Sequence, residues 1–279
     1  MHLVGKTIES ILQQEFTDFE LLVVDDGSKD HTEDVVRKFK DSRVQYYRKE
    51  NGERGAGRNY GQRIAKGMYV NFFDSDDLMY SNHLRVAKEL AESNDRPAIF
   101  YLSYDFKAID GSVTKKADQL GDDTVNKAFF DNFLSCNGVF VRKDVANDFP
   151  FQENRMLASA EDWELWIRLM SRYKLIYSNE ITTSVVGHDQ RSLRTIATDK
   201  IIDRDLFLID CLKKDDQALR AYGRHFKRFV AERYTFFMLC LAEDGRRQDL
   251  FSWAFRAFKV YPLILISRRF LASLKKSFY

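Results

Sequence analysis

The sequence predicts an α/β fold with a mostly parallel sheet flanked by helices, followed by a C-terminal helical extension. Two observations support this prediction. Short apolar runs alternate with amphipathic segments over the first hundred residues, as they do in doubly wound sheets. From Arg191 onward, apolar residues recur at helical intervals instead. The chain has 279 residues, 44% hydrophobic and 31% charged, which is enough for one α/β domain and an appendage.

The elements are expected to alternate along the chain. Apolar runs of strand length occupy residues 19–24, 43–47, 68–73 and 98–102. Helices are expected at residues 3–16, 33–39, 55–66 and 81–92, and Gly67 would end the third of them. The sequence therefore opens with a helix, whereas a βαβ sheet normally opens with the strand that feeds its first helix.

Composition and charge indicate a cellular setting and a division of the chain. The three cysteines show no disulfide or metal spacing, no signal peptide opens the sequence, and no apolar run approaches the roughly 20 residues that span a bilayer. We therefore expect a cytoplasmic protein, and no nucleic-acid partner. Residues 191–279 carry a net charge of +9, which leaves −7 for the rest of the chain. This break predicts a domain over residues 1–192 and a basic, aromatic-rich helical extension over residues 193–279.

The acidic turn Asp74-Ser75-Asp76-Asp77 follows the apolar run at residues 68–73. Three carboxylates this close repel one another unless a cation or solvent lies between them. At the carboxyl end of a parallel strand, their hard oxygens would suit Mg²⁺ or Mn²⁺ together with a substrate's phosphates. The alternative is an acidic turn that caps the helix starting near Ser81, and the motif alone does not decide between the two.

Two other motifs also allow two interpretations each. Asp25-Asp26-Gly27-Ser28 ends the first apolar run. Its carboxylates either bind a base and ribose or belong to a turn that caps the next helix, in which Gly27 supplies an unusual backbone angle. The glycines between Gly55 and Gly61 either let an anion approach a helix N-terminus beside Arg58, or allow close helix–sheet packing with Arg58 in solvent.

Taken in order, strand–DDGS, G-x-G-R-N-x-G and strand–DSDD resemble the inverting GT-A glycosyltransferases of family two, from Leu3 to roughly Ser192. The segments 149–154 and 161–169 look like that family's acceptor-side loop and its E-D-W-x-L-W helix. The resemblance implies a GT-A fold, the Rossmann-like fold of nucleotide-diphospho-sugar transferases. It also implies a single displacement at the anomeric carbon, with inversion.

The resemblance implies the site residues as well. Those that would hold the nucleotide are Asp25, Asp26, Arg58, Asn59 and Asp74. Those that would hold Mn²⁺ or Mg²⁺ are Asp76, Asp77 and His188, and which carboxylate binds the ion directly stays open. A lone histidine is more often structural than functional, so His188 is the least strongly supported of the three metal ligands.

The catalytic part of the resemblance is the helix that begins at Glu161. Asp162 would be the general base that takes the proton of an acceptor hydroxyl, although acidic residues in a first turn also suit the helix dipole. Trp166 and Leu169 are expected in the core, and so is Trp163, with a sugar-stacking platform as the alternative for Trp163.

The expected function is that of a bacterial, metal-dependent hexosyltransferase. It would move a sugar from a nucleotide-diphosphate donor, UDP from family frequency, to a hydroxyl of a cell-surface glycan or lipid-linked acceptor. One rival is an aspartyl phosphatase or phosphotransferase, which wants Thr or Val where Leu78 stands and leaves Asp162 unexplained. The other is an inactive binding scaffold without nucleotide affinity. Relatives open with a strand that precedes Met1 in the alignment, so we expect the true start to lie upstream.

The end of the chain carries a separate signal. After Asp249 the sequence has six basic residues and no acidic one, interleaved with aromatic residues. Such a segment is typical of helices that lie on an anionic membrane surface. The alternative is a helical cap packed on the catalytic domain with its basic face in solvent. A peripheral membrane role is preferred, because the acceptors of such enzymes are often lipid-linked.

Overall fold

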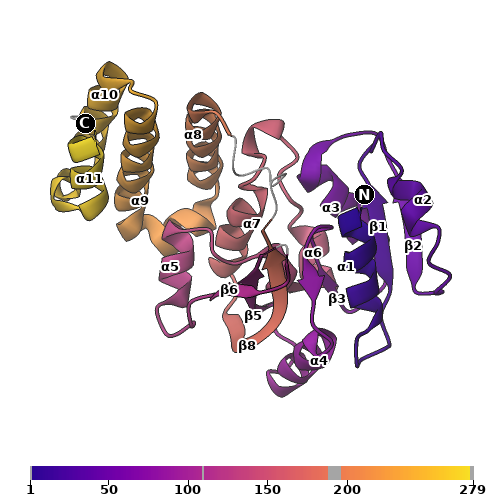
Figure 1. Cartoon of the computed structure of the whole chain (residues 1–279). Helices are drawn as coiled ribbons and strands as arrows, with labels where there is room; N and C mark the ends of the chain where they lie inside the picture. Colours follow the sequence, from indigo (N-terminus) through magenta and orange to yellow (C-terminus); the bar gives the residue numbers. More distant parts are fainter. Residues whose placement is uncertain (1, 109, 188–195, 277–279) are drawn as a thin grey trace. The chain divides into compact units, whose positions relative to one another are not determined.

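The structure is a computed structural model that describes residues 2–108, 110–187 and 196–276 (Figure 1). The chain divides into two compact units. The first unit holds the described residues up to Gly187, apart from Phe129–Asp131. The second holds those three residues and the helices that follow residue 197. Each unit has its own buried core, and each is described separately below.

The first unit contains two sheets. The smaller sheet pairs β1 (Leu21–Asp25) with β2 (Val44–Arg48). The larger sheet has the strand order β3-β7-β5-β8-β4, with β6 paired to β5. Its strands are β3 (Tyr69–Asn71), β4 (Leu78–Met79), β5 (Ile99–Lys107), β6 (Val113–Lys116), β7 (Val139–Arg142) and β8 (Leu175–Val186).

The strand directions correct one part of the prediction. Only β1–β2 and β5–β8 pair in parallel, whereas β3–β7, β5–β7, β4–β8 and β5–β6 are antiparallel. The strands β3 and β5 do run in the same direction, as their alternation with helices predicted. However, β7 lies between them and runs the opposite way. The sheet is therefore mixed rather than mostly parallel, because the chain after residue 102 inserts strands that the sequence pattern did not reveal.

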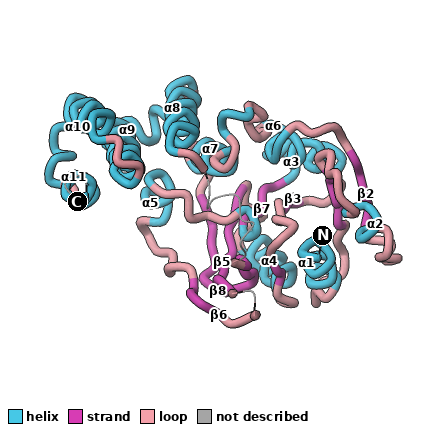
Figure 2. Tube along the Cα trace, turned by 45° about the horizontal axis from the view of Figure 1, so that its top comes forward, coloured by secondary structure: helices cyan, strands magenta, loops and turns pink. Residues whose placement is uncertain are grey.

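α-Helices flank the two sheets of the first unit. They are α1 (His2–Leu12), α2 (Thr32–Val36), α3 (Glu53–Ile64), α4 (His83–Ser93), α5 (Thr124–Phe130), α6 (Lys143–Asp148) and α7 (Glu161–Met170). The first four match the predicted helices within a few residues at each end. The short 3₁₀ turns η1 (Cys136–Gly138) and η2 (Arg155–Leu157) precede β7 and α7. Figure 2 shows β5, β7 and β8 side by side between helices.

Alternate side chains of β5 point to opposite faces of the larger sheet, and α4 and α7 pack on different faces. Phe100 and Leu102 of β5 point to the side where Val86 and Ala87 of α4 form a buried cluster with them. Ile99 and Tyr101, which alternate with them along the strand, join the opposite cluster around Trp166 of α7. Successive side chains on a strand point to opposite faces, so the apolar run of β5 is buried on both sides, as its composition predicted.

Trp166 centres an aromatic group that reaches the site described below. Its side chain is fully buried, and its ring centroid lies 6.5 Å from that of Phe72 and 5.9 Å from that of Phe151. The rings of Phe72 and Phe151 meet edge to face at 4.8 Å, a favoured geometry for aromatic pairs. Trp163 and Leu169 are buried too, and Trp163 Nε1 donates to Ala128 O at 2.7 Å. The prediction that all three residues belong to the core is confirmed.

The second unit is helical. It comprises α8 (Thr198–Lys214), α9 (Asp216–Glu243), α10 (Arg247–Val260), the 3₁₀ turn η4 (Pro262–Ile266) and α11 (Arg268–Lys276). Phe237, Leu241 and Leu250 lie in its apolar core. Asp205, which is fully buried, bridges Arg204 and Arg233 at 2.9 Å each. Across the described part of the chain, every helix is too short or too polar to cross a membrane.

His83, at the start of α4, is a buried neutral histidine. Its Nδ1 lies 2.8 Å from Thr182 Oγ1, and its ring packs 5.1 Å from that of Phe140. Nε2 is buried and has no hydrogen-bond partner among the described residues. Burial lowers the pKa of His83 from 6.5 to about 3, because the charged ring would lie in an apolar environment.

This burial predicts a pH-dependent stability. Above pH 6.5 both the folded and the unfolded chain hold His83 neutral. As the pH falls from 6.5 toward 3, only the unfolded chain gains the proton, so the free energy of unfolding should fall by about 1.4 kcal/mol per pH unit from this group. We expect urea titrations between pH 7 and 5 to show this slope in the wild type and to lose that component in His83→Gln. Equal slopes in the two proteins would contradict the assignment.

Candidate active site

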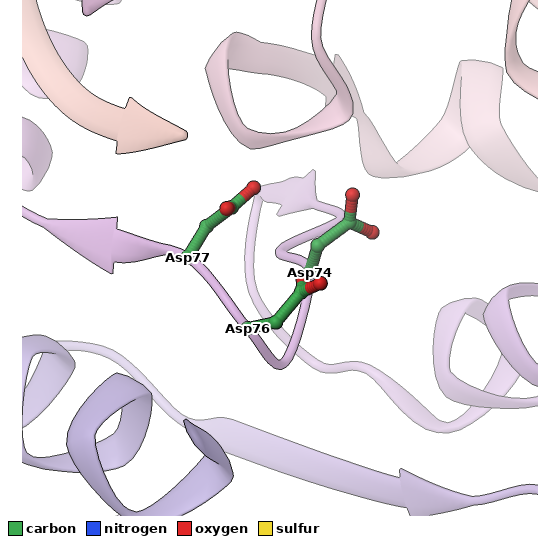
Figure 3. A group of neighbouring side chains, drawn as sticks. All are labelled: Asp74, Asp76 and Asp77. Atoms are coloured by element: carbon green, nitrogen blue, oxygen red, sulfur yellow. The ribbon is translucent and has the colours of Figure 1, made fainter. Parts of the chain in front are cut away.

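The acidic turn after β3 brings three carboxylates together. Asp74, Asp76 and Asp77 each offer one oxygen, and these oxygens lie within 4.8 Å of one another (Figure 3). The chain passes through the turn directly into β4. Asn82 precedes α4 without a side-chain cap, so the alternative that the acidic turn caps this helix is wrong. A set of hard oxygen donors this compact fits a divalent cation such as Mg²⁺ or Mn²⁺.

Asp77 also holds the turn in place. It is 1% exposed, and its two carboxylate oxygens accept hydrogen bonds from Val186 N at 2.8 Å and Asn137 Nδ2 at 2.7 Å. Its carbonyl oxygen accepts from Thr7 Oγ1 at 2.8 Å. The other side of the same amide, Asn137 Oδ1, accepts from Asp74 N at 2.9 Å. Asp77 and Asn137 therefore fix the turn against β8, η1 and α1, and a direct bond from Asp77 to a metal stays a prediction.

Arg58 of α3 links this turn to the start of α7. Its guanidinium donates to Asp74 Oδ1 at 3.0 Å and to Glu161 Oε1 at 2.8 Å, and it lies 5.4 Å from the ring centroid of Phe151. The side chain is 14% exposed, so the alternative that Arg58 points into solvent is wrong. Burial opposes its charge, but the surrounding acidic groups raise the pKa of Arg58 above its usual value. A permanent positive charge therefore lies between two elements that carry carboxylates.

Glu161 is a site residue that the sequence analysis did not single out. It is 3% exposed, and its Oε2 has no hydrogen-bond partner among the described residues. A buried carboxylate is tolerated when a cation is paired with it, and Arg58 is that cation. Two adjacent acidic residues at the start of a helix rich in large apolar side chains were the signal that could have identified it.

Asp162, in the first turn of α7, is half-buried, and each of its carboxylate oxygens has at least one hydrogen-bond donor nearby. Its Oδ1 accepts from Asn132 Nδ2 at 3.1 Å and from Trp163 N at 2.7 Å, and Cys136 Sγ lies 3.7 Å from Oδ2 as a weak donor. Burial, and then the neighbouring charge of Glu161, raise the pKa of Asp162. A carboxylate with a raised pKa is a stronger base than an exposed one. The sequence did not reveal Asn132 or Cys136 as its neighbours.

At the end of β1, Asp25 forms a turn. Its Oδ1 accepts from Ser28 N at 2.7 Å, its Oδ2 accepts from Tyr46 Oη at 2.5 Å, and Gly27 has φ +81°. Burial alone would raise the pKa of Asp25, but the hydrogen bonds from Tyr46 and Ser28 lower it overall. The turn of the second interpretation is confirmed, but it does not cap α2, because the N-cap of that helix is His31 and no side chain caps it. A contact between Asp25 and a nucleotide stays a prediction.

Asp26 binds the segment that leads into α3. Its Oδ1 accepts from Lys49 Nζ at 2.5 Å and from Gly52 N at 2.9 Å, and its carbonyl oxygen accepts from Asn51 Nδ2 at 3.0 Å. The carboxylate therefore ties the end of β1 to the N-terminus of α3. A role in holding a ribose is also still a prediction for Asp26.

Asn59 is fully engaged by the acceptor-side loop. Its Nδ2 donates to Phe151 O at 2.9 Å and to Glu153 Oε1 at 2.8 Å, and its Oδ1 accepts from Phe151 N at 2.8 Å. A side chain at Gly55 would lie 2.6 Å from Gln152 O, so the glycine allows the same loop to approach α3. The amide of Asn59 therefore holds this loop, and a contact between Asn59 and a nucleotide stays a prediction. His188 lies outside the described residues.

The chain resembles known proteins over most of its length. The profile described as Glycosyl transferase family 2 matches residues 2–141. A glycosyltransferase of Rickettsia bellii that has no assigned function is 31% identical over 60% of this chain and 24% of its own length. The UDP-Glc:alpha-D-GlcNAc-diphosphoundecaprenol beta-1,3-glucosyltransferase WfgD of Escherichia coli is 29% identical over 61% of this chain and 65% of its own length. The chain thus spans less than two thirds of either relative.

Solved structures show the same fold at low identity. S. aureus TarS in complex with UDP-GlcNAc matches with a TM-score of 0.69 and 18% identity, over 99% of this chain and 84% of that one. The mannosyltransferase PcManGT of Pyrobaculum calidifontis, in complex with GDP-Man and Mn²⁺, matches with a TM-score of 0.57 and 14% identity, over 100% of this chain and 84% of that one. The predicted GT-A fold is therefore confirmed. Since the family profile covers half of the sequence, the chain belongs to glycosyl transferase family 2.

Proposed function

We propose that the protein transfers a hexose from a UDP-sugar to a hydroxyl of a lipid-linked or cell-surface glycan acceptor, with inversion at the anomeric carbon. The observation that carries this proposal is the Arg58 link. It holds the acidic turn and the helix of the proposed base, Asp162, in one site. Transfer with inversion needs this combination, because the donor's leaving group and the base act on opposite sides of the reacting carbon.

On the acceptor side, Asp162 accepts the proton of the attacking hydroxyl as the new bond forms. A hydroxyl is a poor nucleophile at neutral pH, so a positioned carboxylate contributes to the rate. The hydrogen bonds from Asn132 and Trp163 fix one oxygen of Asp162. Its other oxygen, which faces the weak Cys136 donor, is then the one that takes the proton.

On the donor side, Arg58 and the acidic turn handle the charge of the diphosphate. Arg58 offers a permanent positive charge beside the turn, which stabilises negative charge that develops on the leaving UDP. The residues that would hold Mn²⁺ or Mg²⁺ are Asp74, Asp76 and Asp77, joined by His188, and a bound cation would supply Lewis-acid stabilisation of the diphosphate. Asp25 and Asp26, at the end of β1, would bind the nucleoside.

Relatives support the choice of donor, acceptor and location. The E. coli relative is named as a UDP-Glc-dependent enzyme acting on a diphosphoundecaprenol-linked sugar. GgaB of Bacillus subtilis, 25% identical over 77% of this chain and 26% of its own length, is named as a minor teichoic acid biosynthesis protein. We therefore place the reaction at the cytoplasmic face of a membrane, on a lipid-linked glycan. The phosphatase alternative is less favoured, because it assigns no role to Asp162 or to the residues that surround it.

Nucleotide binding separates this proposal from an inactive scaffold. Calorimetry should detect UDP binding when Mn²⁺ is present. When the metal is chelated, the affinity for UDP should fall by about tenfold or more. Asp76→Asn should weaken the Mn²⁺-dependent binding, whereas the exposed Asp118→Asn should not. Binding that ignores both Mn²⁺ and Asp76→Asn would remove the metal from the proposal, and no binding of any nucleotide would favour the scaffold.

The raised pKa of Asp162 predicts the pH dependence of turnover. The base form is lost as the pH falls through this pKa, so the acid limb of the rate profile should lie above the range of an exposed aspartate, about 3.9. Asn132→Ala removes a donor that stabilises the carboxylate and should move this limb to higher pH. Asp162→Asn should lower turnover by about 10²–10⁴-fold and leave UDP binding unchanged. An unchanged profile in Asn132→Ala would contradict the assignment of the base.

The Arg58 link can be tested by a conservative substitution. Lysine cannot donate to Asp74 and Glu161 at once in a fixed fork geometry, so Arg58→Lys should lower kcat by about 10²-fold. It should also destabilise the fold, by less than the roughly 3–5 kcal/mol that outright removal of a buried partner costs, because lysine keeps the charge but loses one of the two hydrogen bonds. Arg63→Lys, on the exposed side of the same helix, is the matched control, and equal effects of the two substitutions would rule out the link.

A further inference from the structure

Exposed apolar side chains concentrate near the C-terminus of the described chain. Of the ten large apolar residues that are exposed among the described residues, seven lie between residues 251 and 271. We call them the C-terminal apolar surface: Phe251, Phe255, Phe258, Leu263, Leu265, Ile266 and Leu271. Ile266 is 79% exposed and Leu263 is 63% exposed. Apolar residues gathered in this way mark an interaction surface, whereas scattered ones do not.

These residues are not an unfinished part of the core. On α10, Leu250 and Ala257 face inward and join the buried core of the second unit. Phe251, Phe255 and Phe258 are spaced by four and three residues, so they form a separate stripe on another side of the same helix. The helix thus has one apolar side packed in the unit and a second one that water covers.

The charged residues in this part of the sequence are all of one sign. The sequence after Asp249 has no acidic residue, and its basic residues are Arg256, Lys259, Arg268, Arg269, Lys275 and Lys276. Lys276 pairs with Glu243. Lys259 Nζ lies 4.5 Å from the ring centroid of Phe255, so an ammonium group borders the apolar stripe directly. Long basic side chains beside exposed rings complement a surface that is apolar below and anionic at its edge.

We propose that the C-terminal apolar surface inserts into the interface of a membrane that contains anionic lipids. Its phenylalanine and aliphatic side chains enter the boundary between headgroups and acyl chains, and the basic residues bind lipid phosphates. This proposal deepens the location given under the proposed function, but its test uses no substrate. It therefore stands or falls separately from sugar transfer.

The test is flotation of the whole chain with vesicles. Phosphatidylcholine vesicles, with and without about 30% phosphatidylglycerol, separate neutral from anionic lipid. The wild type should float with the anionic vesicles and bind neutral ones far more weakly. Arg268→Gln together with Lys275→Gln should weaken binding by about fivefold for each charge removed. Leu263→Ser together with Ile266→Ser should weaken it by a similar factor or more.

A matched control separates this effect from a general change in surface character. Val113→Ser together with Lys116→Gln removes one exposed apolar and one exposed basic residue from β6, and it should leave flotation unchanged. Circular dichroism would establish that each variant is folded. Equal binding to neutral and anionic vesicles, or no binding, would overturn the proposal. The proposal would also be overturned if light scattering shows a dimer that the Leu263→Ser, Ile266→Ser variant no longer forms, while that variant still binds vesicles.

Discussion

The double ion pair of Arg58 is the interaction on which the site depends. A guanidinium that is 14% exposed is expensive to bury without a partner, and removing it would leave Glu161, which is 3% exposed, without its cation. Arg58 therefore couples three parts of the chain that are far apart in sequence: α3, the turn after β3 and the start of α7. Because one guanidinium pairs with both carboxylates, the acidic turn and the start of α7 are fixed relative to each other. These are the donor and acceptor sides of the proposed site, so it would be preorganised before substrate binds.

A buried aromatic group packs next to the residues that form this polar link. Phe72 lies two residues before Asp74, Trp166 lies one helical turn after Asp162, and Phe151 contacts both rings. The loop that carries Phe151 is in turn held by the Asn59 amide. Asp74 and Asp162 thus lie close in sequence to buried aromatic residues, Phe72 and Trp166, which pack against each other. A buried aromatic group and a saturated amide keep their positions better than a solvated loop would.

The sequence allowed much of this to be predicted, and the physical reasons are specific. The strands around Val24 and Val70 and the helix of Trp166 were clear because burial on both faces or on one face leaves a distinct apolar pattern. The position of Asp162 and of the acidic turn followed from the order of the motifs. The insertion of β7 between β3 and β5 could not be predicted, because strand neighbours are chosen by tertiary packing rather than by local pattern.

The missed site residues have the same explanation. Asn137 serves the acidic turn only because the η1 turn comes very close to β5, where a side chain at Gly138 would collide with the Leu102 carbonyl. Nothing in the local pattern indicates that Asn59 meets a loop more than ninety residues away. Polar residues carry no periodic signature, so their partners become visible only once the backbone has been placed.

The division of the first unit into two sheets has a mechanical consequence. No backbone ladder joins β1 and β2 to the larger sheet among the residues that the structure describes. This two-stranded ribbon, which carries Asp25, is attached through side chains: Glu20 accepts from the backbone of Lys66, and Gly61 packs against Val24. Among the described residues, the turn that carries Asp25 is therefore positioned by α3 and the residues just after it, rather than by hydrogen bonds to the larger sheet.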